Sequence, residues 1–218
     1  MAVSKKHVIQ RLSKHIWGIE KVVWAVTGAK RCSYAPHGID GFIEDLHSLN
    51  LELRNGVICQ TDWPTEDEFH DRYNPQGDSN GDIAVGMYLD IPECCAATFH
   101  QDVKTSHERL IEKHPFEDIG DDKHIEDYCE RLTGHHRRYG FRTVRSDRIH
   151  KETVKLMDER ELPKRTALLL HQYIPCTKDC SAYLEQTEKM WKALREFIPK
   201  QSGNILTRYV RKTRSWKY

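Results

Sequence analysis

The sequence is organised around two similar stretches, IPECC at residues 91–95 and IPCTKDC at residues 174–180. Each follows an apolar segment, passes through Ile-Pro, and places two cysteines at the start of a helical pattern. Four of the seven cysteines in the chain therefore occupy two matching positions. We expect the two stretches to face each other and to bring their sulfurs into one site.

Helix starts suit cysteine thiolates. Proline is favoured at the first helical position, where its missing N–H costs nothing. If Pro92 and Pro175 take that position, Cys94 and Cys176 lie in a first turn, near free backbone N–H groups and the positive end of the helix dipole. Both features stabilise the thiolate, which is the form that binds metals and attacks electrophiles.

The spacing of the cysteines leaves open how many of them share one centre. Cys176 and Cys180 are one helical turn apart, so their sulfurs project from the same face. Cys94 and Cys95 are adjacent and diverge by about 100° on a regular helix. Both bind one centre only if Cys94 lies in the turn before the helix settles. The alternative is a three-cysteine site with an open position or a different fourth ligand.

Two histidines are candidates for that fourth position. His171 lies five residues before Cys176, and His100 lies five residues after Cys95. Either is a metal ligand, a neighbour of the site, or an ordinary packed histidine. The predicted metal ligands are Cys94, Cys95, Cys176, Cys180 and His171.

The pattern differs from a zinc ribbon, which has two CxxC pairs. We expect an iron–sulfur cluster of the 4Fe-4S class, whose sulfurs accept hydrogen bonds from N–H groups at helix starts, with zinc as the alternative. Buried cysteines also pack as small apolar side chains. That role fits Cys59 and Cys129 better than the four motif cysteines, because packing cysteines follow core spacing and do not gather at two helix starts.

The composition indicates a folded protein with one core. At 218 residues, 38% hydrophobic and 31% charged, the chain suits a single domain. Its 34 basic and 33 acidic residues argue against a strongly polyanion-seeking protein. No apolar run approaches the roughly 20 residues of a membrane span, and the start lacks the apolar segment of a secretory signal. We expect a cytoplasmic protein without membrane contact.

Hydrophobic periodicity predicts a mostly helical α+β fold with a small β-sheet. The expected helices cover residues 4–27, 40–48, 92–113 and 180–198. A hairpin turning at Asn55-Gly56 is expected to form the sheet with two apolar strands, at residues 83–89 and 166–173. Residues 61–82 read as a surface loop. The predicted domain comprises N-terminal helices and hairpin (1–60), a cysteine-motif core (83–200) and a basic tail (205–218).

A basic run with interleaved aromatic residues, HHRRYGFR, occupies residues 135–142. Arginine binds phosphate, and tyrosine or phenylalanine can stack on bases. The run therefore predicts contact with RNA or a nucleotide, whereas the balanced net charge favours an ordinary solvated surface. The predicted nucleic-acid residues are Arg137, Arg138, Arg142 and Arg145.

The PECC segment followed by Phe99, together with the HxxxPCxxxC segment at residues 171–180, resembles an uncharacterised, mainly archaeal family known only as a domain of unknown function. The likeness covers residues 86–183. It implies a prokaryotic cytosolic protein, with an archaeal source favoured, and supports treating both cysteine pairs as one unit. The resemblance supplies no reaction.

Three functions from different classes are compatible with these patterns. The first is an iron–sulfur enzyme acting on RNA or a nucleotide, for which sulfur transfer or removal is one possible reaction, with Glu93, Asp179 and His171 as acid–base candidates. The second is a non-catalytic zinc module that binds nucleic acid or protein. The third is a thiol redox protein. No nucleotide-binding glycine loop, HExxH helix or nucleophile elbow occurs.

Overall fold

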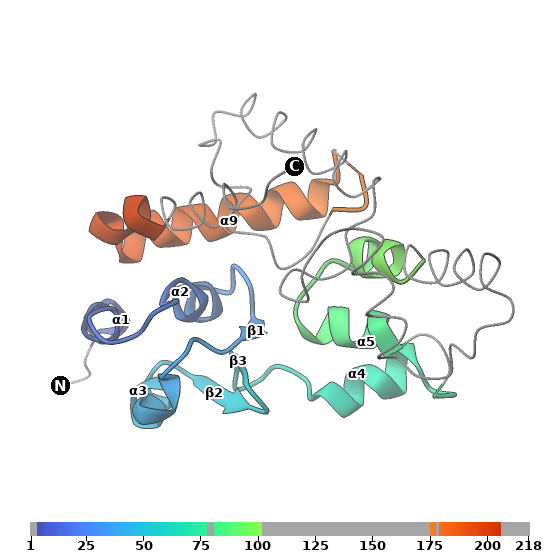
Figure 1. Ribbon diagram of the computed structural model, residues 1–218, viewed down its shortest axis with the longest axis horizontal. Helices are drawn as coiled ribbons and strands as arrows, with labels where there is room; N and C mark the ends of the chain where they lie inside the picture. Colours follow the sequence, from blue (N-terminus) through green and yellow to red (C-terminus); the bar gives the residue numbers. More distant parts are fainter. Residues whose placement is uncertain (1–3, 78–80, 102–174, 178, 206–218) are drawn as a thin grey trace, which may run out of the picture.

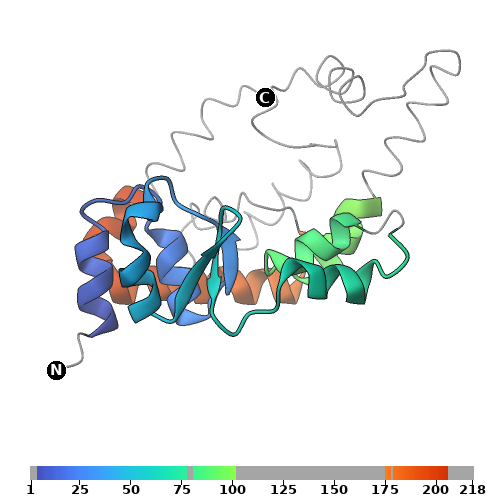
Figure 2. The same cartoon turned by 90° about the horizontal axis from the view of Figure 1, so that it is seen from below.

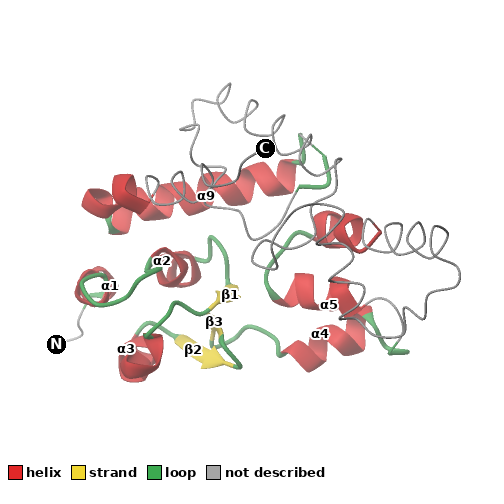
Figure 3. Cartoon of the chain, viewed as in Figure 1, coloured by secondary structure: helices red, strands yellow, loops and turns green. Residues whose placement is uncertain are grey.

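The computed structural model describes residues 4–77, 81–101, 175–177 and 179–205. Within them the chain is mostly helical with one small antiparallel sheet, which confirms the α+β class (Figures 1 and 3). The named elements are α1 (Lys5–Leu12), α2 (Glu20–Thr27), β1 (Cys32–Tyr34), a short 3-10 helix (Ile39–Phe42), α3 (Ile43–Ser48), β2 (Leu51–Arg54), β3 (Val57–Gln60), α4 (Glu66–Tyr73), α5 (Gly81–Tyr88) and α9 (Ser181–Phe197). Residues 93–101 and 199–205 are also helical.

The N-terminal amphipathic segment folds as two helices, so the single helix predicted over residues 4–27 is wrong. Gly28 ends α2 as expected, with a left-handed φ of 70°. Residues 13–19 separate the two helices, and Gly18 in this segment has a left-handed φ of +92°, which a helix does not allow. Beside it, Trp17 forms an isolated antiparallel bridge with His37. This contact is tertiary, and the periodicity of α1 and α2 does not reveal it.

The sheet has the strand order β1-β3-β2. The predicted hairpin is confirmed, with Asn55 (φ 45°) and Gly56 (φ 79°) in the left-handed conformations that a two-residue turn requires. Its third strand is β1, which was not predicted, and β1 pairs with β3. Because β1 has only three residues, it carries too little alternation to be recognised from sequence.

The predicted strand at residues 83–89 is wrong, since this segment forms α5. A short apolar run does not distinguish a buried strand from a buried helix. The predicted loop over residues 61–82 is partly wrong, because it contains α4. Thr65 and Glu68 start α4 with a reciprocal capping box. The helix α5 packs against α4 and takes no part in the sheet.

The predicted last helix is confirmed as α9, which lies across α1 and α2 (Figure 1). Figure 2 shows the sheet between the N-terminal helices and the α4/α5 pair.

Two apolar clusters hold the described chain together. The first core contains the buried faces of α1, α2 and α9 together with Cys95 and Cys180. The second core consists of Cys32, Val57, Cys59, Trp63, Phe69, Tyr88 and Leu89.

Several predictions lie outside the described residues: the helix beyond residue 101, the basic run at 135–142, Cys129, the apolar segment at 166–173, and residues 206–218 of the tail. Among the described residues, no helix has the length and apolar character needed to cross a membrane.

Candidate metal centre

The first cysteine pair is positioned by the way α5 ends. Asp90 has a left-handed φ of 55°, and the N–H of Ile91 donates to the carbonyl of Gly86 (2.9 Å). This is the hydrogen bond of a Schellman-type helix end, with aspartate where glycine is usual. The chain then turns at Pro92, whose carbonyl accepts from the N–H of Cys95 (2.8 Å) and starts the next helix.

Glu93 is the first helical residue, so Pro92 directly precedes the helix and does not occupy the predicted first helical position. Cys94 and Cys95 fall in the first turn, as expected for Cys94. The two helices that meet at this corner approach closely: a Cβ on Gly86 would lie 2.8 Å from the Cβ of Ala96. Only glycine at position 86 permits this approach without a shift.

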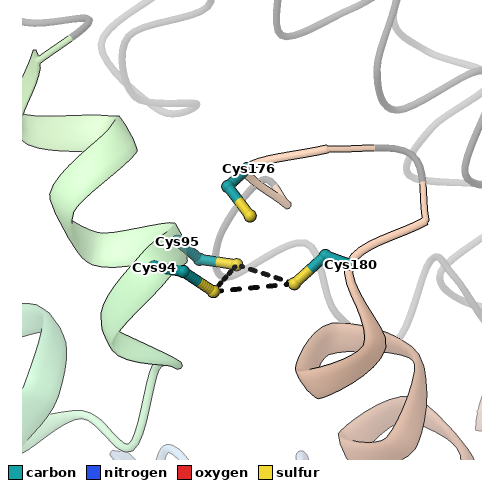
Figure 4. Close-up of side chains that lie close together, drawn as sticks. All are labelled: Cys94, Cys95, Cys176 and Cys180. Atoms are coloured by element: carbon teal, nitrogen blue, oxygen red, sulfur yellow. Dashed lines mark hydrogen bonds between the residues drawn. The ribbon is translucent and has the colours of Figure 1, made fainter.

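The second pair is arranged differently from the prediction. Cys176 lies in the loop before α9, and Cys180 occupies the N-cap position of that helix. The N–H of Cys180 donates to the carbonyl of Thr177 (3.4 Å), and the carbonyl of Cys180 accepts from Leu184 (3.0 Å). The expected single helical turn is therefore a loop that folds back, and both sulfurs still reach one side of it (Figure 4).

All four motif sulfurs meet. The Sγ of Cys94 lies 3.9 Å from that of Cys95 and 3.7 Å from that of Cys180, and the Cys95–Cys180 separation is also 3.7 Å. The Cys176 Sγ completes the group, with all four atoms within 4.8 Å of one another (Figure 4). The cluster could hold a metal ion. The angle of about 100° between adjacent residues on a helix does not keep the sulfurs of Cys94 and Cys95 apart.

The site lies at the edge of the first core. Cys95 and Cys180 are buried, Cys176 is half-buried and Cys94 is exposed. The phenol of Tyr183, on the first turn of α9, is buried close to Cys95 and Cys180. Burial, together with the negative charge that these cysteines can carry, raises the pKa of Tyr183, so its hydroxyl keeps its proton. The site therefore has one apolar side and one open side.

The thiols interact strongly with one another. Burial raises the pKa of Cys95, and burial with hydrogen bonds to Cys176 and Cys180 raises the pKa of Cys94 to about 11. For Cys176, burial opposes ionisation, but hydrogen bonds from the other three thiols outweigh it and lower the pKa. Cys176 therefore ionises more readily than Cys94 or Cys95. A bound cation would favour the thiolate form of all four.

Backbone N–H groups supplement this arrangement. The N–H of Cys176 donates to the Cys95 sulfur, and the N–H of Thr177 donates to the Cys176 sulfur. Such donors stabilise sulfur-bound negative charge without adding a competing side chain. Both donors belong to the loop before α9, whereas the prediction placed such N–H groups at the helix starts.

Asp90 connects the turn between α5 and the helix at residues 93–101 to the rest of the protein, a role that the sequence did not predict. Its carboxylate accepts from the backbone N–H of Arg31 (2.6 Å) and from the Arg31 guanidinium (3.4 Å). Its backbone carbonyl accepts from the side-chain amide of Gln186 on α9 (2.8 Å). One residue thus joins the strand region, α9 and the first cysteine pair. Its position two residues before Pro92 was the available signal.

The remaining predicted residues contribute less to this group. Glu93 and Asp179 are exposed. His100 lies 3.6 Å from a carboxylate oxygen of Asp82 and does not belong to the sulfur group. The other predicted ligand, His171, and the predicted nucleic-acid residues lie outside the described chain, namely Arg137, Arg138, Arg142 and Arg145.

Comparison with protein-family models, with curated proteins and with solved structures finds no match for this chain. The resemblance to an archaeal family stays a prediction.

Proposed function

We propose that the four cysteines bind one metal ion as thiolates, and that this ion joins the helix at residues 93–101 to the start of α9. Sulfur spacing carries the proposal. An ion with metal–sulfur bonds of about 2.3 Å in a tetrahedron holds its ligands about 3.8 Å apart. Three of the sulfur separations are 3.7, 3.7 and 3.9 Å, so a small movement of Cys176 completes the tetrahedron.

Zinc is the ion that best fits this geometry. It favours four-coordinate thiolate sites and requires no redox partner or open position. Because all four ligands come from the protein, the role is structural: the ion connects Cys94 to Cys180, which are 86 residues apart. The protein would then be a zinc-stabilised binding module, and RNA or another macromolecule is its predicted partner.

An iron–sulfur centre is the second candidate. The exposure of Cys94 and the N–H donors to two sulfurs favour it, because both suit an anionic cluster that reacts at an open edge. A cluster with one thiolate on each of four irons spreads its sulfurs farther than one ion does. The observed spacing therefore supports the single ion, and a cluster would require the two cysteine pairs to separate.

The experiment is metal analysis of protein purified without oxygen. We expect one zinc per chain, no acid-labile sulfide and no visible colour. Cobalt substituted for zinc should give the visible absorption of a tetrahedral thiolate complex. A brown protein with labile sulfide would replace the proposal with a cluster. Metal-free protein that binds no added zinc would leave the thiol redox function.

Two variants locate the metal. Cys95→Ser should abolish stoichiometric binding, because it removes a buried ligand. Cys32→Ser is the matched control, since it also replaces a buried cysteine but lies outside the sulfur group. Equal metal content in both variants would contradict the assignment of the ligands.

A further inference from the structure

A second pair of cysteines lies on neighbouring strands. Cys32 of β1 is directly opposite Cys59 of β3. The N–H of Gln60 donates to the carbonyl of Arg31 (3.1 Å), one step outside this pair, so Cys32 and Cys59 form a non-hydrogen-bonded pair of the antiparallel ladder. Residues at such positions have Cα atoms about 4.5 Å apart, which lies within the range of about 4.4–6.8 Å that a disulfide spans.

The two thiols lie in the same buried region. Each shifts the pKa of the other, and both residues have an exposed fraction of 0%. The hydroxyl of Tyr88 lies 4.0 Å from the Cys59 sulfur. These atoms belong to the second core, whereas Cys95 and Cys180 belong to the first. Within the described chain, the only group that could hold a metal contains neither Cys32 nor Cys59.

The surroundings make the two thiols unequal. The hydrogen bond from Cys32 lowers the pKa of Cys59; burial opposes this shift, and the positive charge of Arg54 assists it. That same hydrogen bond, together with burial, raises the pKa of Cys32. A dithiol in which one thiol ionises more readily than its neighbour has the arrangement of an attacking and a resolving cysteine.

We propose that Cys32 and Cys59 form a redox site separate from the metal centre, a dithiol that closes to a cross-strand disulfide when a small peroxide oxidises it. The Cys59 thiolate attacks one peroxide oxygen and the O–O bond breaks, which gives a sulfenic acid on Cys59 and, after proton uptake, one water. The Cys32 thiol then attacks the Cys59 sulfur. The S–S bond forms, the S–O bond breaks, and hydroxide leaves with the Cys32 proton as a second water. Two thiols lose two electrons, and hydrogen peroxide gains them.

The burial of both sulfurs favours a small oxidant over a bulky one. Because both sulfurs are buried, hydrogen peroxide can reach them through small openings of the second core, whereas a bulky disulfide such as oxidised glutathione requires larger unfolding. The backbone already places the residues in register, so closure needs no change in strand pairing.

Tryptic mapping of the metal-loaded full chain tests the proposal. Cleavage after Arg31, Arg54 and Arg72 places Cys32 in peptide 32–54 and Cys59 in peptide 55–72, each with one cysteine. After hydrogen peroxide and alkylation of free thiols, the two peptides should be recovered cross-linked, and dithiothreitol should separate them. The oxidised protein should melt roughly 5 °C higher, because the bond closes a loop between the two strands. Oxidised glutathione should react far more slowly.

Cys32→Ser removes the resolving thiol. Its Cys59 should accumulate sulfenic acid, detected as a dimedone adduct on peptide 55–72. If this variant does not fold, the wild-type map still decides. The proposal is overturned if both thiols stay reduced at a peroxide dose that oxidises them in guanidinium-unfolded protein. Cross-links to another cysteine, or sulfinic acid in place of the disulfide, would also overturn it.

Discussion

The protein places cysteines in two kinds of backbone, and the difference decides how many sulfurs meet. On the paired strands, Cys32 has one neighbour directly across, so two sulfurs come together in a dry interior. At the metal centre, a helix start and a loop converge from distant parts of the chain, and four sulfurs meet at an edge where Cys94 is exposed. A pair of strands brings two sulfurs together, which suits a disulfide. A helix start and a loop that converge bring four together, which suits a metal ion.

The same replacement made in both regions tests most directly whether the two groups of cysteines act separately. Cys180→Ser should weaken zinc binding by more than about 100-fold and lower the melting temperature by roughly 10 °C or more, because metal binding contributes directly to folding. Cys59→Ser should leave zinc content unchanged. Competition with a chromophoric chelator and calorimetry measure both effects. Similar zinc loss in the two variants would show that the regions are not separate.

Lys30, beside Cys32, gives the strand region its own pH dependence. The side chain is fully buried, and burial lowers its pKa from 10.5 to about 8. Between about pH 8 and 10 the unfolded chain therefore binds more protons than the folded chain, so this residue makes stability rise with pH. Over that range wild type should gain about 2 kcal/mol relative to Lys30→Met.

Urea denaturation of zinc-loaded samples at pH 8, 9 and 10 measures that difference. Taking the difference between the two proteins removes the contributions of the cysteines, which they share. Parallel stability curves would refute the prediction, and a changed zinc content would show that Lys30 also acts on the metal centre.

Asp90 connects the two regions, so its replacement should affect both. Asp90→Ala removes the carboxylate that accepts from the Arg31 N–H and should cost about 1.5 kcal/mol, because a hydrogen bond to a charged group is lost. Asp90→Asn should cost less, because asparagine retains an acceptor and tolerates the left-handed backbone. Zinc affinity and the rate of Cys32–Cys59 cross-linking should both change in Asp90→Ala. An effect confined to one region would show that this residue does not link them.

The smallest effect tests the close approach beside Cys94 and Cys95. Gly86→Ala should cost about 1 kcal/mol net, because crowding against Ala96 exceeds the gain in helix propensity. Zinc binding should weaken slightly as the helix at residues 93–101 shifts. Gly41→Ala is the matched control, since a Cβ there has no atom within 4 Å. Equal stability of the two variants in urea would contradict the proposed crowding.

Sequence reasoning worked where the signal was local. Asn55-Gly56 specified a hairpin because few residues adopt both backbone conformations of that turn. The apolar face of α9 specified a long helix. The two stretches that begin with Ile-Pro also indicated which four cysteines would meet, since they share a context that the other cysteines lack.

Other features depend on contacts that no local pattern contains. The segment between α1 and α2 contains the bridge from Trp17 to His37, and the helix α5 packs against α4. The sulfur separations are tertiary as well, so the sequence alone did not distinguish a single ion from a cluster. For the same reason the pairing of Cys32 with Cys59 depends on β1, which no local pattern predicted.

Cys180 has a consequence for communication across the molecule, because it is both a predicted ligand and the N-cap residue of α9. This helix has 17 residues and is therefore about 25 Å long. Just beyond its far end, the side-chain amide of Gln201 donates to the Ser13 hydroxyl (3.0 Å), next to α1. Metal binding at the four cysteines should therefore change the rate of amide hydrogen exchange in α1, because α9 connects the two regions.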